Sequence, residues 1–505
     1  MGTVNAEKPD HEVGTGPFAS SRECFAEMLS WLEGTEAAAV THADLEEHVT
    51  RRGRELCRRM FQDHLDLRAL RERPVSVVDA NGAAHRCIEA GHRRQLATVV
   101  GAVTVERVAY RHDRTANLHP ADAALNLPPE RHSHGLRRLA AIESTRGSFD
   151  DAADAIGRAT GARVAKRQVE QLTATAAVDV DGFYAAAAPG PGPSRDVLVL
   201  SVDGKGVVMR PESLRPATKT AADHAQPKLE GRLSKGEKRN RKRLAEVGAV
   251  YDLEPVARTP NDVMASADRD DAPPTPKATG KWVTASVTHD AATVVARVFD
   301  EAGRRDPGHT RRWIALVDGN NHQIDRINAE AAARHINVTT ICDFIHVLEY
   351  LWGSAWCFFE EADPAAETWV RDKALAVLEG HATDVAAGIR RRATTAKLPT
   401  AKRTKADTCA KYLCNKAPYL DYPTALAAGW PIASGVIEGT CRYLVADRMD
   451  ITGARWSVDG AEAVLKLRAV RTNGDFDTYW QWHLTKEHER VHQSHYAHGI
   501  IPLAA

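Results

Sequence analysis

The sequence predicts a mixed α/β fold in which helical regions flank one central sheet. Three strand-like runs follow one another at 196–209, 243–255 and 281–288. Helical and strand-like runs then alternate from 291 to 348, and no strand pattern returns between 350 and 430. Successive strands followed by helix and strand alternation indicate one mixed sheet whose first three strands are antiparallel.

The first 128 residues predict helices and a small sheet. Residues 1–20 are polar and are expected to be disordered. Apolar residues recur at helical spacing from 21 to 73, and 75–110 alternates around an Asn81-Gly82 turn. This pattern predicts short antiparallel strands. We therefore expect 21–128 to be a helical and small β region.

Residues 129–188 predict a helix-turn-helix region. Ser148 can cap a first helix that ends in a glycine turn, and a second helix from near Val164 carries Lys166 and Arg167. A helix, a short turn and a basic helix form the layout that sets a recognition helix in the major groove of DNA. Spacing alone fits an ordinary helical hairpin equally well.

A Pro- and Gly-rich linker at 188–194 precedes the first part of the core, 195–349. A polar insert at 211–243 interrupts that core, and its last sixteen residues hold eight basic residues and two acidic ones. The basic residues include Lys238, Arg239 and Arg241. Such a run is ordinarily a solvated loop, and a flexible loop that contacts phosphates is the alternative.

The remaining third of the chain predicts helices. Residues 350–430 are expected to be all-helical, and 431–480 carry a helix that contains Glu438. Residues 481–505 are expected to form a tail with exposed histidines.

The composition indicates a soluble cytoplasmic protein without a membrane partner. Lys+Arg and Asp+Glu each number 67 in 505 residues, so formal net charge is zero. This excludes a uniformly basic nucleic-acid coat but not a local basic groove. The eight cysteines form no C-x-x-C pair, which favours reduced thiols over a zinc ribbon. No signal core and no apolar run long enough to cross a bilayer are present.

Three carboxylates occupy positions that suit a metal site. Asp203 lies within an apolar strand, Asp318 at the end of another, and Glu438 beside the apolar stripe of a late helix. A buried Asp203 is costly unless it is paired or bound to metal. Two strands and a helix that each lend one carboxylate can hold two Mg²⁺ ions for phosphodiester chemistry. Asn320 is expected to orient Asp318. For Glu438, the alternative to metal binding is an exposed ion pair with Arg442.

Four segments resemble DDE-type insertion-sequence transposases of the ISKra group, in the Mutator-like branch. They are VDGKG at 202–206, LVDGNN at 316–321, CDFIHVLEYLW at 342–352, and the block from SGVIEG to RTNG at 434–474. The last block is the most specific, because an acid, an arginine and Gly-x-Arg-Trp occur in order. The resemblance covers most of the chain, and it implies an RNase H-like core with a helical insertion domain at 350–430.

The resemblance also implies roles for single residues. Asp203, Asp318 and Glu438 would be the catalytic acids that hold two Mg²⁺ ions, with Mn²⁺ able to substitute. Asp343 and His346 match the (C/D)-x-x-H motif of that branch, and we expect the histidine to support the strand end rather than to catalyse.

The last block also supplies expected DNA contacts. Arg442, Arg448 and Arg455 suit phosphate binding. Trp456 suits stacking on a base beside the cleaved bond, and core packing is an equally supported alternative.

The sequence therefore predicts a DNA transposase. Its N-terminal regions would bind terminal inverted repeats, and its core would cleave DNA and join it to a target by in-line attack on phosphodiester bonds. The resemblance further implies a homodimer or larger assembly on double-stranded DNA, associated with a prokaryotic nucleoid. An RNase H-like nuclease without strand transfer and a domesticated DNA-binding protein are the alternatives.

Overall fold

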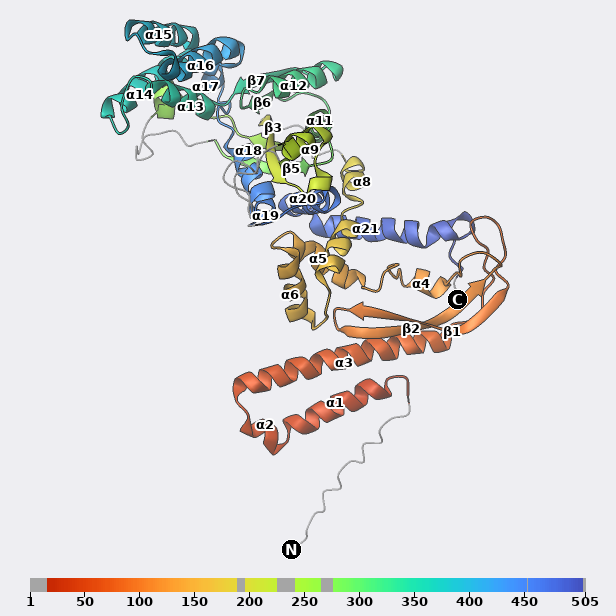
Figure 1. The fold of residues 1–505 in the computed structure, drawn as a ribbon. Coiled ribbons are helices and arrows are strands. Elements are labelled where there is room, and N and C mark those ends of the chain that lie inside the picture. The colour runs from red at the N-terminus through yellow and green to blue at the C-terminus, as the bar shows by residue number, and fades with distance from the viewer. Residues whose placement is uncertain (1–15, 189–195, 225–240, 265–275, 452, 503–505) are drawn as a thin grey trace. The chain divides into compact units, whose positions relative to one another are not determined.

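The computed structural model describes residues 16–188, 196–224, 241–264, 276–451 and 453–502 (Figure 1). The chain divides into two compact units. The first consists of Met1–Phe183 with Asp477–Ala505, and the second of Tyr184–Phe476. In the described part of the chain, no helix is both long enough and apolar enough to cross a membrane. All eight cysteines are described, and each is a free thiol.

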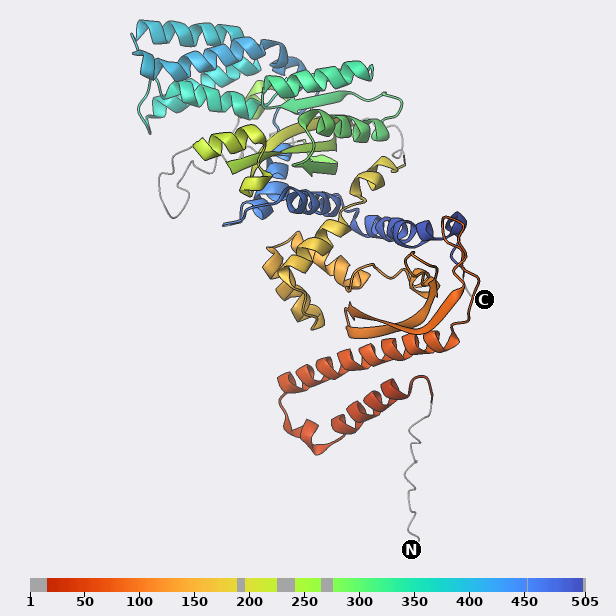
Figure 2. The same ribbon diagram turned by 45° about the vertical axis from the view of Figure 1, so that its right-hand side comes forward.

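The first unit is mainly helical and holds one β-hairpin. Its elements are α1 (Ala19–Leu32), α2 (Thr35–Ala39), α3 (His42–Arg71), β1 (Cys87–Thr98), β2 (Gly101–Arg111), α4 (Pro120–Ala124), α5 (His134–Ser144), α6 (Phe149–Thr160) and α7 (Lys166–Ala176). Two further helices, α8 (Val180–Ala185) and α21 (Phe476–Val491), span its boundaries. Helices α1 and α3 lie side by side, and the hairpin packs on α3 (Figures 1 and 2). Leu65, Leu96 and Val103 form part of the apolar contact beneath that hairpin.

The hairpin differs from the short strands that the sequence predicts. Strands β1 and β2 contain 12 and 11 residues, and their tight turn joins Thr98 to Gly101. The Asn81-Gly82 turn closes only an isolated bridge between Val78 and Ala84. Local turn chemistry predicted that bend correctly, but the longer pairing depends on the apolar face that α3 covers.

Helices α5, α6 and α7 pack around a small core that includes Leu136, Ile156 and Val169. The Ser148 side chain caps α6 and accepts a hydrogen bond from the Asp151 amide, while the Asp151 carboxylate accepts one from the Ser148 amide. Gly161 ends α6 in the left-handed region, with a φ of 74°. The predicted cap and glycine turn are therefore present, and α7 begins at Lys166.

Part of the chain end is packed: His488 and His492 are covered, whereas His495 and His498 are exposed. Helix α21 continues into short 3₁₀ turns at Gln493–His495 and Ala497–Gly499. His492 is buried, and its Nε2 lies 2.8 Å from the carbonyl oxygen of Leu127. His488 Nε2 lies 3.0 Å from the carbonyl oxygen of Ala123. The imidazoles of His488 and His492 thus contact backbone carbonyls within the first unit. The spacing of the histidines in the sequence does not indicate these contacts.

The second unit contains a five-stranded mixed sheet, so the predicted α/β class is confirmed. Its strands are β3 (Val197–Val208), β4 (Lys242–Leu253), β5 (Ala278–Ser286), β6 (Trp313–Val317) and β7 (Val338–Cys342). The spatial order is β5-β4-β3-β6-β7. The pairs β3–β4 and β4–β5 are antiparallel, whereas β3–β6 and β6–β7 are parallel. The three successive strands are thus antiparallel, and the strands that follow helices are parallel.

Helices connect the strands and cover the sheet. They are α9 (Pro216–His224), α10 (Pro260–Met264), α11 (Ala291–Arg305), α12 (Asn321–Ala333), α13 (Phe344–Ala355), α14 (Pro364–Leu378), α15 (Ala382–Thr395), α16 (Thr400–Lys416) and α17 (Tyr422–Ala427). Helix α11 packs closely on β4, since a Cβ atom at Gly248 would lie 2.4 Å from Val298 Cγ2. Helices α13–α17 gather into one helical body (Figures 1 and 2), whose apolar core is continuous with that of the sheet.

Two segments differ from the predicted elements. The insert at 211–243 begins with a 3₁₀ turn, Pro211–Ser213, and α9, so this part is not a loop. The late helix is interrupted: α18 (Gly435–Thr440) runs through a π-helical segment, Cys441–Ala446, into α19 (Asp447–Met449). Helix α20 (Val458–Thr472) starts separately. A π-helical segment changes the rotation per residue, so the even helical pattern predicted for the whole stretch does not hold.

Candidate active site

The parallel strands bring three aspartates to one level: Asp203 lies within β3, and Asp318 and Asp343 directly follow β6 and β7. Ser201 pairs with Leu316, so the same register sets Asp203 opposite Asp318. Val317 pairs with Cys342, so the next position sets Asp318 opposite Asp343. The Asp343 amide continues that ladder by donating to the Val317 carbonyl at 2.8 Å. Continued past the last strand pairs, this register brings the three aspartates to the same end of β6 and β7.

Asp203 is partly buried in β3 and is held by a residue from outside the sheet. The Cys441 thiol donates to Asp203 Oδ2 at 3.3 Å, and the Gly204 amide donates to Oδ1 at 2.6 Å. Burial, and next the neighbouring Asp203 carboxylate, raise the pKa of the Cys441 thiol. The thiol therefore keeps its proton and remains a donor, which ties the π-helical segment to β3.

Asp318 follows β6 in the turn that leads into α12. Gly319 has a φ of +91°, and the Asn320 amide donates to Asp318 Oδ1 at 2.7 Å. The Asn320 side chain caps α12 by accepting from the His322 amide at 3.0 Å. Asn320 thus orients Asp318 through its backbone, while its side chain fixes the start of the helix.

Asp343 is fully buried and uses both carboxylate oxygens. Its Oδ1 accepts from the Ile345 amide at 2.6 Å and caps α13, and its Oδ2 accepts from the amide and the hydroxyl of Ser434. Burial acts to raise the pKa of Asp343, but His346 and these donors outweigh it and hold that pKa below its usual value. Because Ser434 is the residue before α18, this contact fixes the start of the helix that carries Glu438.

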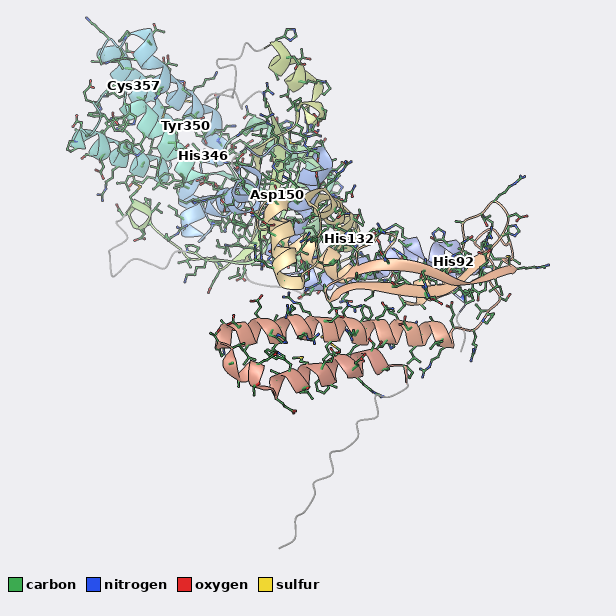
Figure 3. All side chains as sticks on the ribbon, turned by 60° about the horizontal axis from the view of Figure 1, so that its bottom comes forward. His92, His132, Asp150, His346, Tyr350 and Cys357 are labelled. Carbon is green, nitrogen blue, oxygen red and sulfur yellow. The ribbon has the colours of Figure 1, made fainter. Side chains whose placement is uncertain are left out.

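Glu438 lies with Asp343 and His346. One ligand atom from each of these three side chains lies within 4.8 Å of the other two. His346 Nδ1 is 3.7 Å from Asp343 Oδ2, an ion-pair rather than a hydrogen-bond distance. The Asp343 carboxylate raises the pKa of His346 to about 9, so the imidazole is charged near neutral pH. His346 and Tyr350, both on α13, are labelled in Figure 3.

Asp203 and Asp318 are not members of that close group. Among the described residues, the group of Asp343, His346 and Glu438 is the one set of three His, Cys, Asp or Glu side chains with ligand atoms so close together. The strand register instead sets Asp203, within β3, level with Asp318 at the end of β6. This edge of the sheet therefore gathers four carboxylates and one imidazole from β3, the ends of β6 and β7, and two helices.

Comparison with known proteins does not assign a function to the chain. Neither a protein-family model nor a curated protein matches the chain. The chemistry of the residues themselves must therefore carry the functional conclusion.

Two residues expected to contact DNA are buried instead. Arg448 and Trp456 are 2% and 5% exposed, and the Arg448 guanidinium carbon lies 4.6 Å from the centre of the Trp456 ring. The Trp456 indole donates to the Met449 carbonyl at 3.1 Å. Trp456 thus follows the packing alternative, and the phosphate-binding role expected of Arg448 does not fit its burial. Arg442 and Arg455 are both exposed, as phosphate contacts require.

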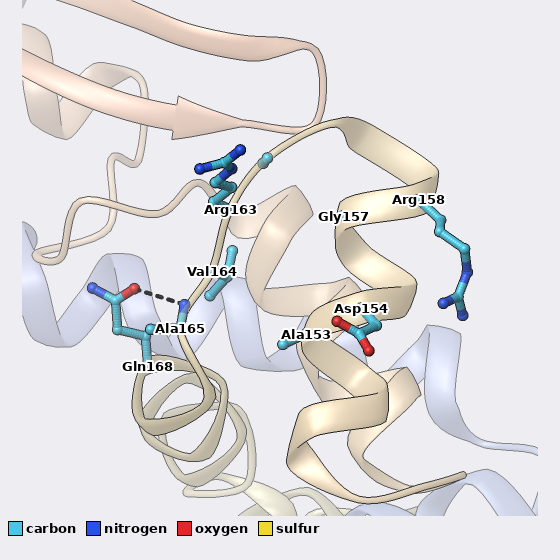
Figure 4. A pocket seen from close by; sticks show the side chains of 9 residues that line it. Ala153, Asp154, Gly157, Arg158, Arg163, Val164, Ala165 and Gln168 are labelled. Carbon is cyan, nitrogen blue, oxygen red and sulfur yellow. Dashed lines mark hydrogen bonds between the residues drawn. The ribbon is translucent and has the colours of Figure 1, made fainter.

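The basic residues predicted on α7 are exposed. Lys166 and Arg167 lie in its first turn, and the Lys166 ammonium pairs with the Asp150 carboxylate. Beside that turn, an open pocket of about 490 Å³ lies between α6 and α7, with Arg158 and Arg163 on its lining (Figure 4). The first turn of α7 is therefore exposed to solvent.

The basic insert is only partly described. Lys238 and Arg239 lie outside the described residues. Arg241 is partly buried, and its carbonyl accepts a hydrogen bond from the Met209 amide at 2.9 Å, which extends the β3–β4 ladder.

Four residues at this edge were not singled out from the sequence: Ser434, Cys441, Tyr412 and Lys416. Only Lys416 carried a local signal, because it continues the buried stripe of α16 formed by Cys409 and Leu413. A lysine on an apolar stripe needs a specific partner. Ser434, Cys441 and Tyr412 are recognisable only from the contacts that the fold creates.

Proposed function

We propose that the protein is a DDE-type DNA transposase that uses Asp203, Asp318 and Glu438 as its acids. The observation that carries this proposal is the shared level of Asp203 and Asp318 on adjacent parallel strands. Glu438 joins them from α18, whose start is hydrogen-bonded to the third strand end through Ser434 and Asp343. Acids contributed by two strands and a helix to one edge suit phosphodiester chemistry with divalent metal ions.

The architecture supports the proposal at the level of the fold. Three antiparallel strands followed by two parallel strands fit the RNase H-like core that the resemblance implies. The helices α13–α17 lie in the sequence between β7 and α18, where the resemblance expects an insertion domain.

The donor set fits Mg²⁺ or Mn²⁺. Asp343 already accepts three hydrogen bonds, so it supports the site and the other carboxylates are the better ligands. Asp318 Oδ2 and both oxygens of Glu438 have no hydrogen-bond or ion-pair partner among the described residues. Carboxylate oxygens are the ligands that Mg²⁺ prefers. When bound, two such ions would favour deprotonation of the attacking water or hydroxyl and stabilise the leaving oxygen.

The chain's own groups have distinct tasks in this proposal. Asp203 presents its oxygens from within β3 and Asp318 from the end of β6, and Cys441 keeps the Asp203 side chain in place. The partly exposed imidazolium of His346 adds a positive charge that attracts the phosphate backbone of DNA. The exposed first turn of α7, with Lys166 and Arg167, would bind the terminal repeats in the major groove.

Replacement of one acid tests the catalytic assignment. Asp318→Asn should lower Mg²⁺-dependent cleavage of supercoiled plasmid DNA by about a hundredfold or more, while a filter-binding assay shows unchanged DNA affinity. Asp325→Asn, on the exposed side of α12, is the matched control and should cleave normally. Cleavage by Asp318→Asn at the wild-type rate would contradict the assignment.

Strand transfer separates the three classes of function. The assay offers a target plasmid together with pre-cut duplex ends, taken from any inverted repeats found beside the gene. A transposase joins the ends to the plasmid, a nuclease cuts without joining, and a DNA-binding protein does neither. Size-exclusion chromatography of the protein with those ends tests the proposed dimer or larger assembly.

A further inference from the structure

Two side chains of α16 reach the turn that contains Asp318. The Tyr412 hydroxyl donates to the Asp318 carbonyl oxygen at 3.3 Å, and the Lys416 ammonium donates to the Asn321 amide oxygen. Tyr412 and Lys416 are four residues apart on one helix, so they share one face. Tyr412 follows Asp318 by 94 residues in the sequence, and Lys416 follows Asn321 by 95. One helix face therefore holds both ends of the four-residue turn after β6.

Tyr412 fits this turn closely. A Cβ atom at Gly319 would lie 2.7 Å from the Tyr412 hydroxyl oxygen, so the ring lies directly against the glycine. The Tyr412 ring also stacks on Tyr350 of α13, with centroids 4.1 Å apart and planes at 22°. Burial raises the pKa of Tyr412, so its hydroxyl stays protonated and can donate to the Asp318 carbonyl.

Lys416 makes a contact that a merely solvated lysine would not make. The residue is only 6% exposed, and it lies on the buried stripe of α16. A buried ammonium is costly unless it is hydrogen-bonded. The amide oxygen of Asn321, the first residue of α12, supplies that bond. The burial of this charge thus ties α16 to the start of α12.

We propose that Tyr412 and Lys416 are positioning residues that hold the Asp318 turn in the geometry needed to bind a divalent metal ion. This inference rests on the proposed function, because it assigns Asp318 as a metal ligand. The two side chains act through the backbone and the helix start, and neither touches the metal. The helical body α13–α17 thereby contributes to the metal affinity of an acid on the sheet.

Metal affinity tests the inference without any need for DNA. The probe is Mn²⁺ alone, added to the full chain, and the free ion is measured by electron paramagnetic resonance. Tyr412→Phe keeps the ring against Gly319 and the stack on Tyr350 but removes the donor. It should weaken Mn²⁺ binding about fivefold, which corresponds to about 1 kcal/mol. Lys416→Met, which keeps the length of the side chain, should weaken binding at least as much.

The matched control is Tyr419→Phe. Tyr419 is a partly buried tyrosine three residues after Lys416, and it makes no hydrogen bond to the Asp318 turn among the described residues. This variant should bind Mn²⁺ within about twofold of the wild type. In plasmid cleavage, Tyr412→Phe should raise the Mn²⁺ concentration for half-maximal rate, and saturating Mn²⁺ should restore the rate. A general loss of folding would not be restored in this way.

The outcomes separate the inference from the proposed function. If Asp318→Asn loses Mn²⁺ binding but Tyr412→Phe and Lys416→Met bind like the wild type, the positioning role is overturned and the acid assignment stands. If Asp318→Asn binds Mn²⁺ as the wild type does, or the wild type binds none, both are overturned. Equal weakening by Tyr412→Phe and Tyr419→Phe also overturns the positioning role, because the effect would not be specific to the turn.

Discussion

The buried carboxylate of Asp343 accepts hydrogen bonds from both the amide and the hydroxyl of Ser434, 91 residues later in the chain. The Phe344 amide strengthens this junction by donating to the Ile432 carbonyl at 2.8 Å. The junction joins the end of β7 to the start of α18. Glu438, one turn into α18, therefore depends on Asp343 for its place beside the strand ends.

Removal of the Ser434 hydroxyl should destabilise the second unit. Ser434→Ala leaves a buried carboxylate with one donor fewer, which should lower the free energy of unfolding by about 1.5–3 kcal/mol. Urea denaturation followed by tryptophan fluorescence measures the loss. Thr404→Ala, which removes an exposed hydroxyl from α16, should change that free energy by less than about 0.5 kcal/mol. A loss in Ser434→Ala as small as in this control would contradict the role of the junction.

Stability should fall on the alkaline side of neutrality through His346. Its folded-state pKa of about 9 lies above the usual 6.5, so its stabilising contribution is complete below about pH 6.5 and is lost as pH rises through 9. The lowered pKa of Asp343 gives a contribution that is lost only as pH falls below its usual value of 3.8. Urea midpoints between pH 6 and 10 measure the slope, and His346→Ala should flatten it. An unchanged slope in that variant would assign the pH dependence to other groups.

Gly319 and Gly303 should respond to alanine in opposite directions. Gly319 has a φ of +91° and lies against Tyr412, so Gly319→Ala should cost at least about 1 kcal/mol of stability and weaken Mn²⁺ binding. Gly303 lies within α11 with no heavy atom within 4 Å of an added Cβ. Gly303→Ala should therefore stabilise by about 0.5–1 kcal/mol. Thermal unfolding measures both, and equal shifts would contradict the strain at Gly319.

A buried arginine should dominate the stability of the first unit. Arg137 is fully buried and pairs with Glu487 at 2.9 Å and with Glu130. Arg137→Met would leave Glu487 buried without that partner, which should cost about 3–5 kcal/mol. Arg138→Met is the adjacent control, because its exposed pair with Asp477 should contribute at most about 1 kcal/mol. Similar denaturation midpoints for the two variants would contradict this assignment.

The exposed start of α7 should account for part of the salt dependence of DNA binding. The double variant Lys166→Ala with Arg167→Ala should reduce the slope of log K against log salt by about 0.9 for each phosphate that the protein no longer neutralises. Fluorescence anisotropy with a labelled DNA duplex measures that slope at several salt concentrations. Arg371→Ala, an exposed arginine of α14, should leave it unchanged. If the double variant had the same salt slope as the wild type, α7 would not be part of the DNA-binding surface.

The local features of the fold could be predicted from the sequence. The apolar run in β3 and the alternation of helices and strands after 290 gave the mixed sheet and its strand directions. Ser148 and Gly161 marked the ends of α6, because caps and left-handed glycines act within a few residues of the backbone they fix. The strand-end positions of Asp318 and Asp343 followed from the same local patterns.

Contacts between distant segments could not be predicted in this way. Arg448 and Trp456 have the composition of a DNA-contacting pair, yet they stack on each other inside the second unit. The hairpin of β1 and β2 formed beyond the Asn81-Gly82 turn, because the strand that pairs best is the one whose apolar face α3 can bury.

The sequence by itself determined the type of each element and placed three aspartates in or at the ends of strands, because backbone preferences and hydrophobic periodicity act over a few residues. The tertiary structure decided that these aspartates share one level of the sheet, that Ser434 and Cys441 hold two of them, and that α16 reaches the turn of the third. Such contacts depend on packing between segments that are far apart in the chain, and no local pattern encodes them.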